Sequence, residues 1–366
     1  MAKETTSHTW TRAVSEEVGV RSRQPEVTGA LELDLIRKRL EEESLKASAA
    51  SQERNPLEDL VFLPANLTRM VIDPYREPCS TVTEIRGRFA GQSLEMQMPL
   101  IVGPTAFHSA AEIGREAIRA ACEQCGIACM VDSSEAHTEN GSCILRVPGA
   151  EELGTVHGAS VSAVEINYEW ESGNGDRCQL ADAIAAVREK VGGHIPIGLS
   201  LGPENVRQHT LRAIEGGADF LVVDMAPISE LSNTGESERP LFPRIDALVS
   251  ALLTLREQGH EETIPVICRG GIRNGADAAR LMCIGSTAAV LDHAALIALS
   301  ESPASSRKSS EDQAESLARF LKATSLEITL MARACGKTNV HNLEPEDLRA
   351  LSLCAATAAG VPIVGQ

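Results

Sequence analysis

The stretch VICRGGIRNGADAARLMCIGSTAAVLDHAALIALS, which runs from Val266 to Ser300, decides the fold class. Its pattern predicts a strand, a glycine turn, a helix, a second strand and a second helix. Two parallel strands connected through a helix are the repeating unit of a β/α protein. The stretch therefore favours a parallel β/α architecture.

The same alternation continues on the amino-terminal side of this stretch. From residue 99 onward, short β-rich runs alternate with amphipathic helical segments. The runs lie at 99–103, 127–132, 143–147, 162–169, 195–201, 220–225, 263–269 and 288–293. Eight strands in about 200 residues suit a closed barrel. We therefore predict an α/β fold, namely an eight-stranded parallel β/α (TIM) barrel with N-terminal and C-terminal helical extensions.

The barrel region has a polar extension on each side. Residues 1–58 are charge-rich, and 30–51 have helical spacing that suits either a solvated arm or a docking helix. Residues 59–300 hold the barrel and the segment leading into it. Residues 301–366 begin with a Ser-rich linker, continue as a helix to about Ala334 and end in a helical segment expected to pack on the barrel.

The overall charge narrows the range of partners. The chain has 366 residues, a formal net charge of -17 and ten cysteines. Such a charge repels nucleic acid and anionic membranes, so we expect a small-molecule substrate. The first 24 residues lack an apolar signal segment, and no run of 18 apolar residues occurs. We therefore expect a cytoplasmic protein with reduced thiols.

Polar side chains follow most of the predicted strands. Reacting groups of a β/α barrel project from the carboxyl ends of its strands. The candidate catalytic residues at these ends are His108, Glu165, Ser200, Asp224, Asp292 and His293. His137, in the loop after the second strand, is a further possible base. Four of these groups, Glu165, Asp224, Asp292 and His293, could also converge on a divalent metal, but the spacing alone predicts no metal site.

The turn after the seventh strand has the form of a phosphate site. Gly270 and Gly271 would let backbone N–H groups approach an anion at the start of the next helix, with Arg273 close by. Asp292 follows the neighbouring strand and would repel a phosphate unless it is protonated, paired or turned away. A phosphate site and a simple tight turn both remain open.

Three cysteines have the spacing of a cluster or zinc loop. Cys122 and Cys125 lie three residues apart on a predicted helix, and Cys129 lies on the strand that follows. Ligand sets of this kind normally occupy loops and need a fourth partner, so the three thiols need not converge. We interpret them as core residues and expect no iron–sulfur cluster.

Several segments resemble a known family. DLVFLPANLTRMVIDPYREPC (59–79), GGIRNGADAARLMCIGS (270–286) and ARACGKTNVHNLEPEDLRAL (332–351) resemble the FMN-binding domain of glutamate synthases, particularly the archaeal-type and glutamate-synthase-like proteins. GPTAFHSAAEIGREAIRAACEQCG (103–126) is similar to the related FMN-dependent hydroxy-acid oxidases. The resemblance covers about residues 58 to 366.

The resemblance implies FMN at the barrel mouth and redox chemistry on an amine or imine related to 2-oxoglutarate and glutamate. It also implies a homo-oligomer, or a complex with glutamine amidotransferase-like or paralogous subunits. The positions that match the family's flavin contacts are Pro104, Thr105, Ala106, Ser133, Ser134, Gly270, Gly271 and Arg273.

Three departures fall on the family's cofactor contacts. Ser200 stands where the family has a flavin-contacting lysine, Asp292-His293 replaces a Gly-Thr pair, and Asp224-Met225 replaces Asp-Gly. Three hypotheses therefore stay open. The chain is an FMN-dependent oxidoreductase, a divergent barrel that has lost FMN and serves as a structural or regulatory partner of an intact paralogue, or a non-flavin enzyme that uses the acidic rim.

Overall fold

The computed structural model describes residues 10, 12–24, 38, 55–65, 77–133, 142–149, 161–168, 177–191, 193–226, 243–300 and 309–365. Eight parallel strands close into a barrel in sequence order, and the last strand pairs with the first. They are β4 (Leu100–Val102), β5 (Ala128–Asp132), β6 (Cys143–Val147), β7 (Val161–Ile166), β8 (Ile197–Leu201), β9 (Phe220–Asp224), β10 (Val266–Arg269) and β11 (Ala288–Leu291). The predicted α/β barrel is confirmed, and each predicted run overlaps one strand.

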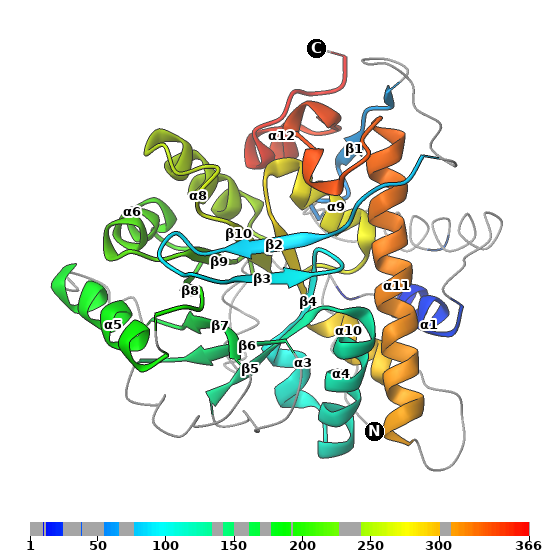
Figure 1. Ribbon diagram of the computed structural model, residues 1–366. Coiled ribbons are helices and arrows are strands. Elements are labelled where there is room, and N and C mark those ends of the chain that lie inside the picture. Colours follow the sequence, from blue (N-terminus) through cyan, green and yellow to red (C-terminus); the bar gives the residue numbers. More distant parts are fainter. Residues whose placement is uncertain are drawn as a thin grey trace, which may run out of the picture.

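Helices cover the outside of the barrel (Figure 1). They are α3 (Pro104–Ser109), α4 (Glu112–Cys125), α5 (Arg177–Lys190), α6 (Val206–Gly216), α8 (Ile245–Glu257), α9 (Gly275–Ile284) and α10 (His293–Ser300). In α4 the buried positions include Ala117, Ile118, Ala121 and Cys122, the spacing of one helix face. Gly126 ends this helix with a φ of 63°, where the absence of a Cβ removes the left-handed strain.

A hairpin that the sequence analysis did not predict closes the amino-terminal end of the barrel. It consists of β2 (Thr83–Arg86) and β3 (Ser93–Met96), seen in cyan across the barrel in Figure 1. Ile85, Leu94 and Met96 are buried with the inward-facing strand residues, among them Phe220. The barrel interior is therefore a packed core, and open space can lie only towards the carboxyl ends of the strands.

The C-terminal part of the chain packs along one side of the barrel. Helix α11 (Ser310–Ala334) begins at a capping box formed by Ser309 and Asp312 and ends where the sequence predicted. It packs against α4, α9 and α10. Beyond it lie the short helices η4 (Val340–Asn342) and η5 (Pro345–Asp347), then β12 (Leu348–Ala350) and α12 (Leu353–Ala359). β12 pairs antiparallel with β1 (Leu60–Phe62), which joins the segment before the barrel to the one after it.

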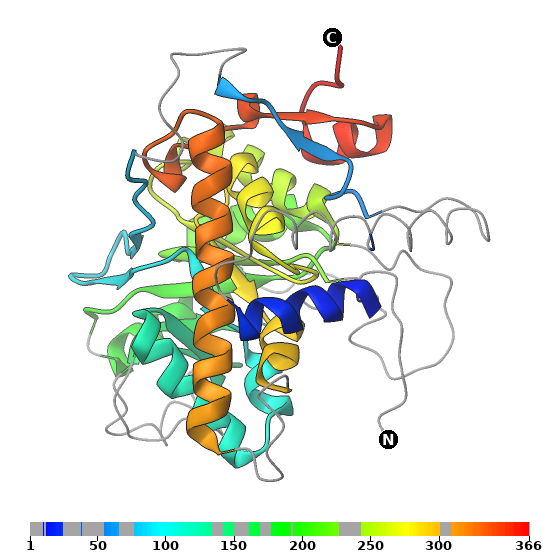
Figure 2. The same ribbon diagram turned by 90° about the vertical axis from the view of Figure 1, so that its right-hand side faces the viewer.

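Part of the polar N-terminal extension is packed against the barrel. Helix α1 (Arg12–Arg23) lies across α11 and also contacts α10 (Figure 2). Arg21 pairs with Glu327 of α11 at 3.0 Å and with Glu17 at 3.1 Å, and all three side chains are buried. The prediction for 30–51 lies outside the described residues, except for Lys38. In the described part of the chain, no helix is long and apolar enough to cross a membrane.

Candidate functional site

Arg269 lies at the centre of the barrel mouth. It is the last residue of β10 and is buried. Its Nε donates a hydrogen bond to Asp224 at 3.0 Å, and its two terminal nitrogens reach Glu165 and Ser200, each at 3.3 Å. Parallel pairing places Arg269 directly beside Asp224. Burial alone would lower the pKa of Arg269, but the carboxylates of Asp224 and Glu165 outweigh that effect and raise it.

A second arginine extends this ion-pair network across the mouth. Arg146 of β6 lies 3.4 Å from the other oxygen of Glu165 and 3.1 Å from Asp132. The strand register sets this contact, because Arg146 pairs with Asp132 on one side and with Glu165 on the other. Glu165 is fully buried between two guanidinium groups. The predicted acidic rim therefore contains cations that neutralise it.

Asp292 lies where two backbone donors converge. Its Oδ1 accepts hydrogen bonds from the N–H groups of Thr105 at 2.9 Å and Ala106 at 3.4 Å, in the first turn of α3. A Cβ on Gly103 would approach Oδ1 of Asp292 to 2.2 Å, so this glycine makes room for the carboxylate. Burial raises the pKa of Asp292, against the opposing effects of Arg269 and the two N–H groups.

The glycine turn after β10 is packed against neighbouring backbone. Gly270 and Gly271 have φ angles of 99° and 71°, which only glycine adopts readily. A Cβ on Gly270 would lie 2.5 Å from the backbone nitrogen of Ala226, and one on Gly271 would lie 2.3 Å from Pro243. Arg273 is buried in ion pairs with Asp277 and Glu58. Close packing and positive φ angles therefore explain why glycine occupies both positions, and no bound ligand is needed to explain it.

Backbone N–H groups at the start of the helix that follows this turn also have hydrogen-bond acceptors within the protein. The first N–H group of α9, on Gly275, donates to the Glu327 carboxylate at 2.7 Å. The Asn274 side chain caps the same helix by accepting from the N–H of Asp277 at 3.0 Å. Burial raises the pKa of Glu327, although Arg21 and the Gly275 N–H favour its ionised form. Two donors at this helix start are thus already in use.

A small cavity remains between these groups. Its volume is about 110 Å³, and its lining includes Arg269, Gly270, Asp292, His293 and Trp10. The Trp10 ring stacks on the His293 ring with 5.3 Å between centroids. Sites for cofactors and drug-sized ligands typically measure about 300 to 1,000 Å³. The cavity at the barrel mouth is well below that range, and Trp10 forms part of its wall.

The other predicted residues do not join this cavity. Pro104 is buried at the start of α3, and His108 is exposed on the same helix. Ser133, just after β5, is half-buried outside the cavity lining. Ser134 and His137 lie outside the described residues. Across the ranges that the structure describes, no group of three or more His, Cys, Asp and Glu side chains could hold a metal ion.

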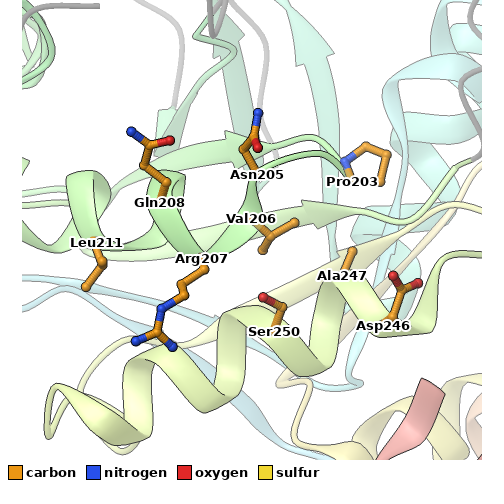
Figure 3. Close-up of a pocket in the computed structure, with 9 residues that line it drawn as sticks. All are labelled: Pro203, Asn205, Val206, Arg207, Gln208, Leu211, Asp246, Ala247 and Ser250. Atoms are coloured by element: carbon orange, nitrogen blue, oxygen red, sulfur yellow. The ribbon is translucent and has the colours of Figure 1, made fainter. Parts of the chain in front are cut away.

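A larger hollow lies on the outer wall of the barrel. It measures about 500 Å³ and opens between α6 and α8, with Gln208, Leu211 and Ser250 among its lining residues (Figure 3). It contains none of the predicted site residues. Despite its smaller volume, the mouth is the candidate site because buried charged groups converge there.

The sequence analysis missed two contributors to the mouth, Trp10 and Arg146. An arginine within the apolar run CILRV (143–147) was a usable signal, because a charge inside a barrel strand needs a buried partner. Nothing near Trp10 in the sequence indicates that it reaches the barrel. It contributes to the cavity through the packing of the N-terminal segment on α10 and α11.

Solved structures with a similar fold include flavocytochrome b2 and mandelate oxidase. A flavocytochrome b2 variant matches with a TM-score of 0.58 at 16% identity, covering 85% of this chain and 80% of that one. A mandelate oxidase variant with (S)-mandelic acid matches with a TM-score of 0.56 at 15% identity, covering 80% and 86%. The chain thus shares its barrel fold with flavocytochrome b2 and mandelate oxidase.

Sequence comparisons find similarity to glutamate synthases. Residues 175–305 match the model of a conserved region in glutamate synthase. A glutamate synthase large subunit-like protein of Rhizobium meliloti (strain 1021) is 25% identical over 385 residues, covering 84% of this chain and 87% of that protein. An archaeal-type glutamate synthase (NADPH) of Thermotoga maritima is 29% identical over 128 residues, which is 33% of this chain and 24% of that protein. The chain is therefore similar to glutamate-synthase-like proteins, which confirms the resemblance that the sequence analysis named.

The resemblance to glutamate synthases implies FMN at the barrel mouth, but the described residues there do not fit it. The Thr105 and Ala106 N–H groups, at the positions matching the family's flavin-touching turn, already bond to Asp292. Arg273 is held by Asp277 and Glu58. Ser200 stands where the family has its flavin-contacting lysine, and its hydroxyl group accepts a hydrogen bond from Arg269. The remaining cavity of about 110 Å³ is too small for a flavin ring and its phosphate tail.

Proposed function

We propose that this chain is a glutamate-synthase-like barrel subunit that does not hold FMN in its own mouth and acts as a structural or regulatory partner of a flavin-bearing paralogue. The observation that carries this proposal is the Asp292 carboxylate bonded to the Thr105 and Ala106 N–H groups. It supplies a negative charge where the family supplies small phosphate-binding residues. A flavin phosphate would have to bind beside that charge.

The electrostatics of the mouth support this proposal. Arg269 is the buried cation in the cavity wall, and it is already paired with Asp224 and Glu165. Binding a phosphate there would require breaking a buried ion pair, which would leave a carboxylate unpaired at a cost of several kcal/mol. The pairing therefore opposes anion binding even if the Trp10 side chain moves aside.

The second candidate is an FMN-dependent oxidoreductase acting on an amine or imine of the glutamate type with other subunits. The specific observation in its favour is the Gly270-Gly271 turn, which keeps positive φ angles and lines the cavity. This reading requires Asp292 to leave the Thr105 N–H group and the cavity to enlarge severalfold. When bound, FMN would supply hydride transfer.

Fluorescence titration with FMN separates the two candidates. We expect no binding by the wild-type chain, and Asp292→Gly, which removes both the charge and the bulk, tests whether this carboxylate is the main barrier. Asp292→Asn is the matched variant, because it removes the charge and keeps the size. Binding by Asp292→Asn as well as Asp292→Gly would identify charge as the barrier, whereas tight binding by the wild type would refute the proposal.

A further inference from the structure

Three cysteines meet on the outer side of the barrel wall, away from the mouth. Cys129 is buried in β5, Cys143 is the half-buried first residue of β6, and the two are register partners in adjacent parallel strands. Register partners in a sheet point to the same face. Cys122 reaches the same face from the last turn of α4, the helix that packs over β5.

Cys129 is the middle thiol of this group. Its Sγ donates a hydrogen bond to the carbonyl oxygen of Ser142 at 4.0 Å, and the neighbouring thiols of Cys122 and Cys143 influence its pKa. Cys125, on the same helix as Cys122, bonds instead to the carbonyl oxygen of Ala318 at 3.8 Å. The sequence analysis interpreted Cys122, Cys125 and Cys129 as core residues, and all three are buried; it did not single out Cys143, which lies beside Cys129 on the neighbouring strand.

We propose that Cys129 and Cys143 form a thiol-oxidation site, at which a peroxide produces a reversible disulfide between β5 and β6. The Cys129 sulfur attacks one peroxide oxygen, the O–O bond breaks, and the other oxygen leaves as water after protonation. The Cys143 sulfur then attacks the Cys129 sulfenic acid and displaces its hydroxyl group, which leaves as water with the Cys143 proton. In sum, two thiols and one peroxide give one disulfide and two waters.

Strand geometry selects Cys143 as the partner. Adjacent strands lie about 4.8 Å apart, within the Cα separation of about 4.4 to 6.8 Å that disulfides require. Cys143 is half-buried, so a small oxidant can approach the Cys129–Cys143 pair from its side, whereas Cys122 is buried on the inner face of α4. No metal-binding group of three such side chains occurs in the described ranges, so metal ligation does not account for these thiols.

The electrostatic setting agrees with this assignment. Hydrogen bonds from Cys122 and Cys143, with a further contribution from Arg119, hold the pKa of Cys129 well below its usual value. The pKa values of Cys122 and Cys143 are raised by the shared hydrogen bonds and by burial. One thiol of the group is thus the preferred thiolate, and the thiolate is the nucleophile in this chemistry.

Peptide mapping of the full-length protein tests the proposal. The reduced protein is treated with stepwise amounts of hydrogen peroxide, denatured, alkylated and digested without reductant. We expect a cross-linked peptide pair joining Cys129 to Cys143 that disappears with dithiothreitol. Exposed Cys354 serves as the internal reference for oxidant exposure. A Cys122–Cys129 link, or alkylatable Cys129 and Cys143 at peroxide levels that oxidise Cys354, would overturn it.

Two variants sharpen the result. Cys143→Ser should abolish the cross-link and leave a Cys129 sulfenic acid that dimedone traps. Cys125→Ser is the matched control, because it removes a buried thiol from α4 that does not touch Cys129, and it should keep the wild-type cross-link. Circular dichroism checks the fold of both variants, and the wild-type map alone decides the proposal if Cys143→Ser fails to fold.

Discussion

Arg269 and Asp292 define the barrel mouth at the scale of single residues. Arg269 binds two carboxylates and a hydroxyl group, and Asp292 bonds to two backbone N–H groups. Asp292 therefore occupies backbone donors, and the carboxylates occupy the guanidinium group, that a phosphorylated ligand would need. The protein's own side chains thus occupy most of the mouth, in a barrel fold shared with flavocytochrome b2 and mandelate oxidase.

The ion pairs of Arg269 should matter for stability. Arg269→Met would leave Glu165 fully buried with only Arg146 as counter-ion, and we expect the free energy of unfolding to fall by about 3 to 5 kcal/mol. Urea denaturation measures the change. Arg86→Met is the matched control, because the Arg86 side chain is 76% exposed beside Glu84 and its loss should cost about 1 kcal/mol or less. Equal losses of unfolding free energy in the two variants would show that burial of the Arg269 ion pairs does not contribute to stability.

Among the elements, the eight strands and α11 were predictable and the hairpin and α1 were not. The strands are short β-rich runs, and Ser309 and Asp312 form a capping box that predicts the start of α11. The hairpin strands TEIR and SLEM are too short to show a clear alternation. Helix α1 is dense in charge, and its burial depends on the pairing of Arg21 with Glu327, 306 residues away.

The candidate site was predictable in its position but not in its pairing. Strand ends placed Glu165, Ser200, Asp224 and Asp292 on one rim, because carboxyl ends of parallel strands meet at one end of a barrel. Sequence could not show that Arg269 would bind three of them, since strand tilt and register decide which side chains meet. The sequence also could not show that the Asp292 carboxylate would accept a hydrogen bond from the Thr105 N–H group.

Helix α6 gives a prediction for pH dependence. Burial lowers the pKa of His209 from 6.5 to about 4, with a smaller contribution from Arg212. As pH falls, the unfolded chain therefore takes up the proton before the folded chain does. We expect the free energy of unfolding to be unaffected by His209 above about pH 6.5 and to fall by about 2 to 3 kcal/mol between pH 6.5 and 4.

Urea denaturation at a series of pH values measures this effect. His209→Gln should remove it, so the difference between wild type and variant should shrink or change sign as pH falls. His194→Gln, at an exposed position, is the control and should follow the wild type. Parallel curves for His209→Gln and wild type from pH 7 to pH 4 would contradict the assignment.

At the scale of the whole molecule, the two ends of the chain pack on the barrel. Helix α1 and Trp10 reach the mouth and α11, and β1 pairs with β12 beside the barrel. The barrel is thus one part of a larger folded unit. This packing leaves Glu327 buried between Arg21 and the start of α9.

Deleting residues 1–24 tests the role of this packing. The deletion removes the Arg21 partner of Glu327 together with the buried face of α1, and we expect the free energy of unfolding to fall by about 3 to 5 kcal/mol. Adding Glu327→Gln to the deletion should restore part of that loss, because it removes the unpaired charge. Unchanged stability after the deletion would show that α1 is not part of the folded unit.

The most direct test of the central claim is the visible absorption spectrum of the purified wild-type protein, followed by calorimetric titration with FMN. The account predicts a protein without flavin bands and without measurable heat of binding, because Asp292 and the paired Arg269 fill the mouth. Flavin bands in the purified protein, or stoichiometric FMN binding by the wild-type chain, would contradict it.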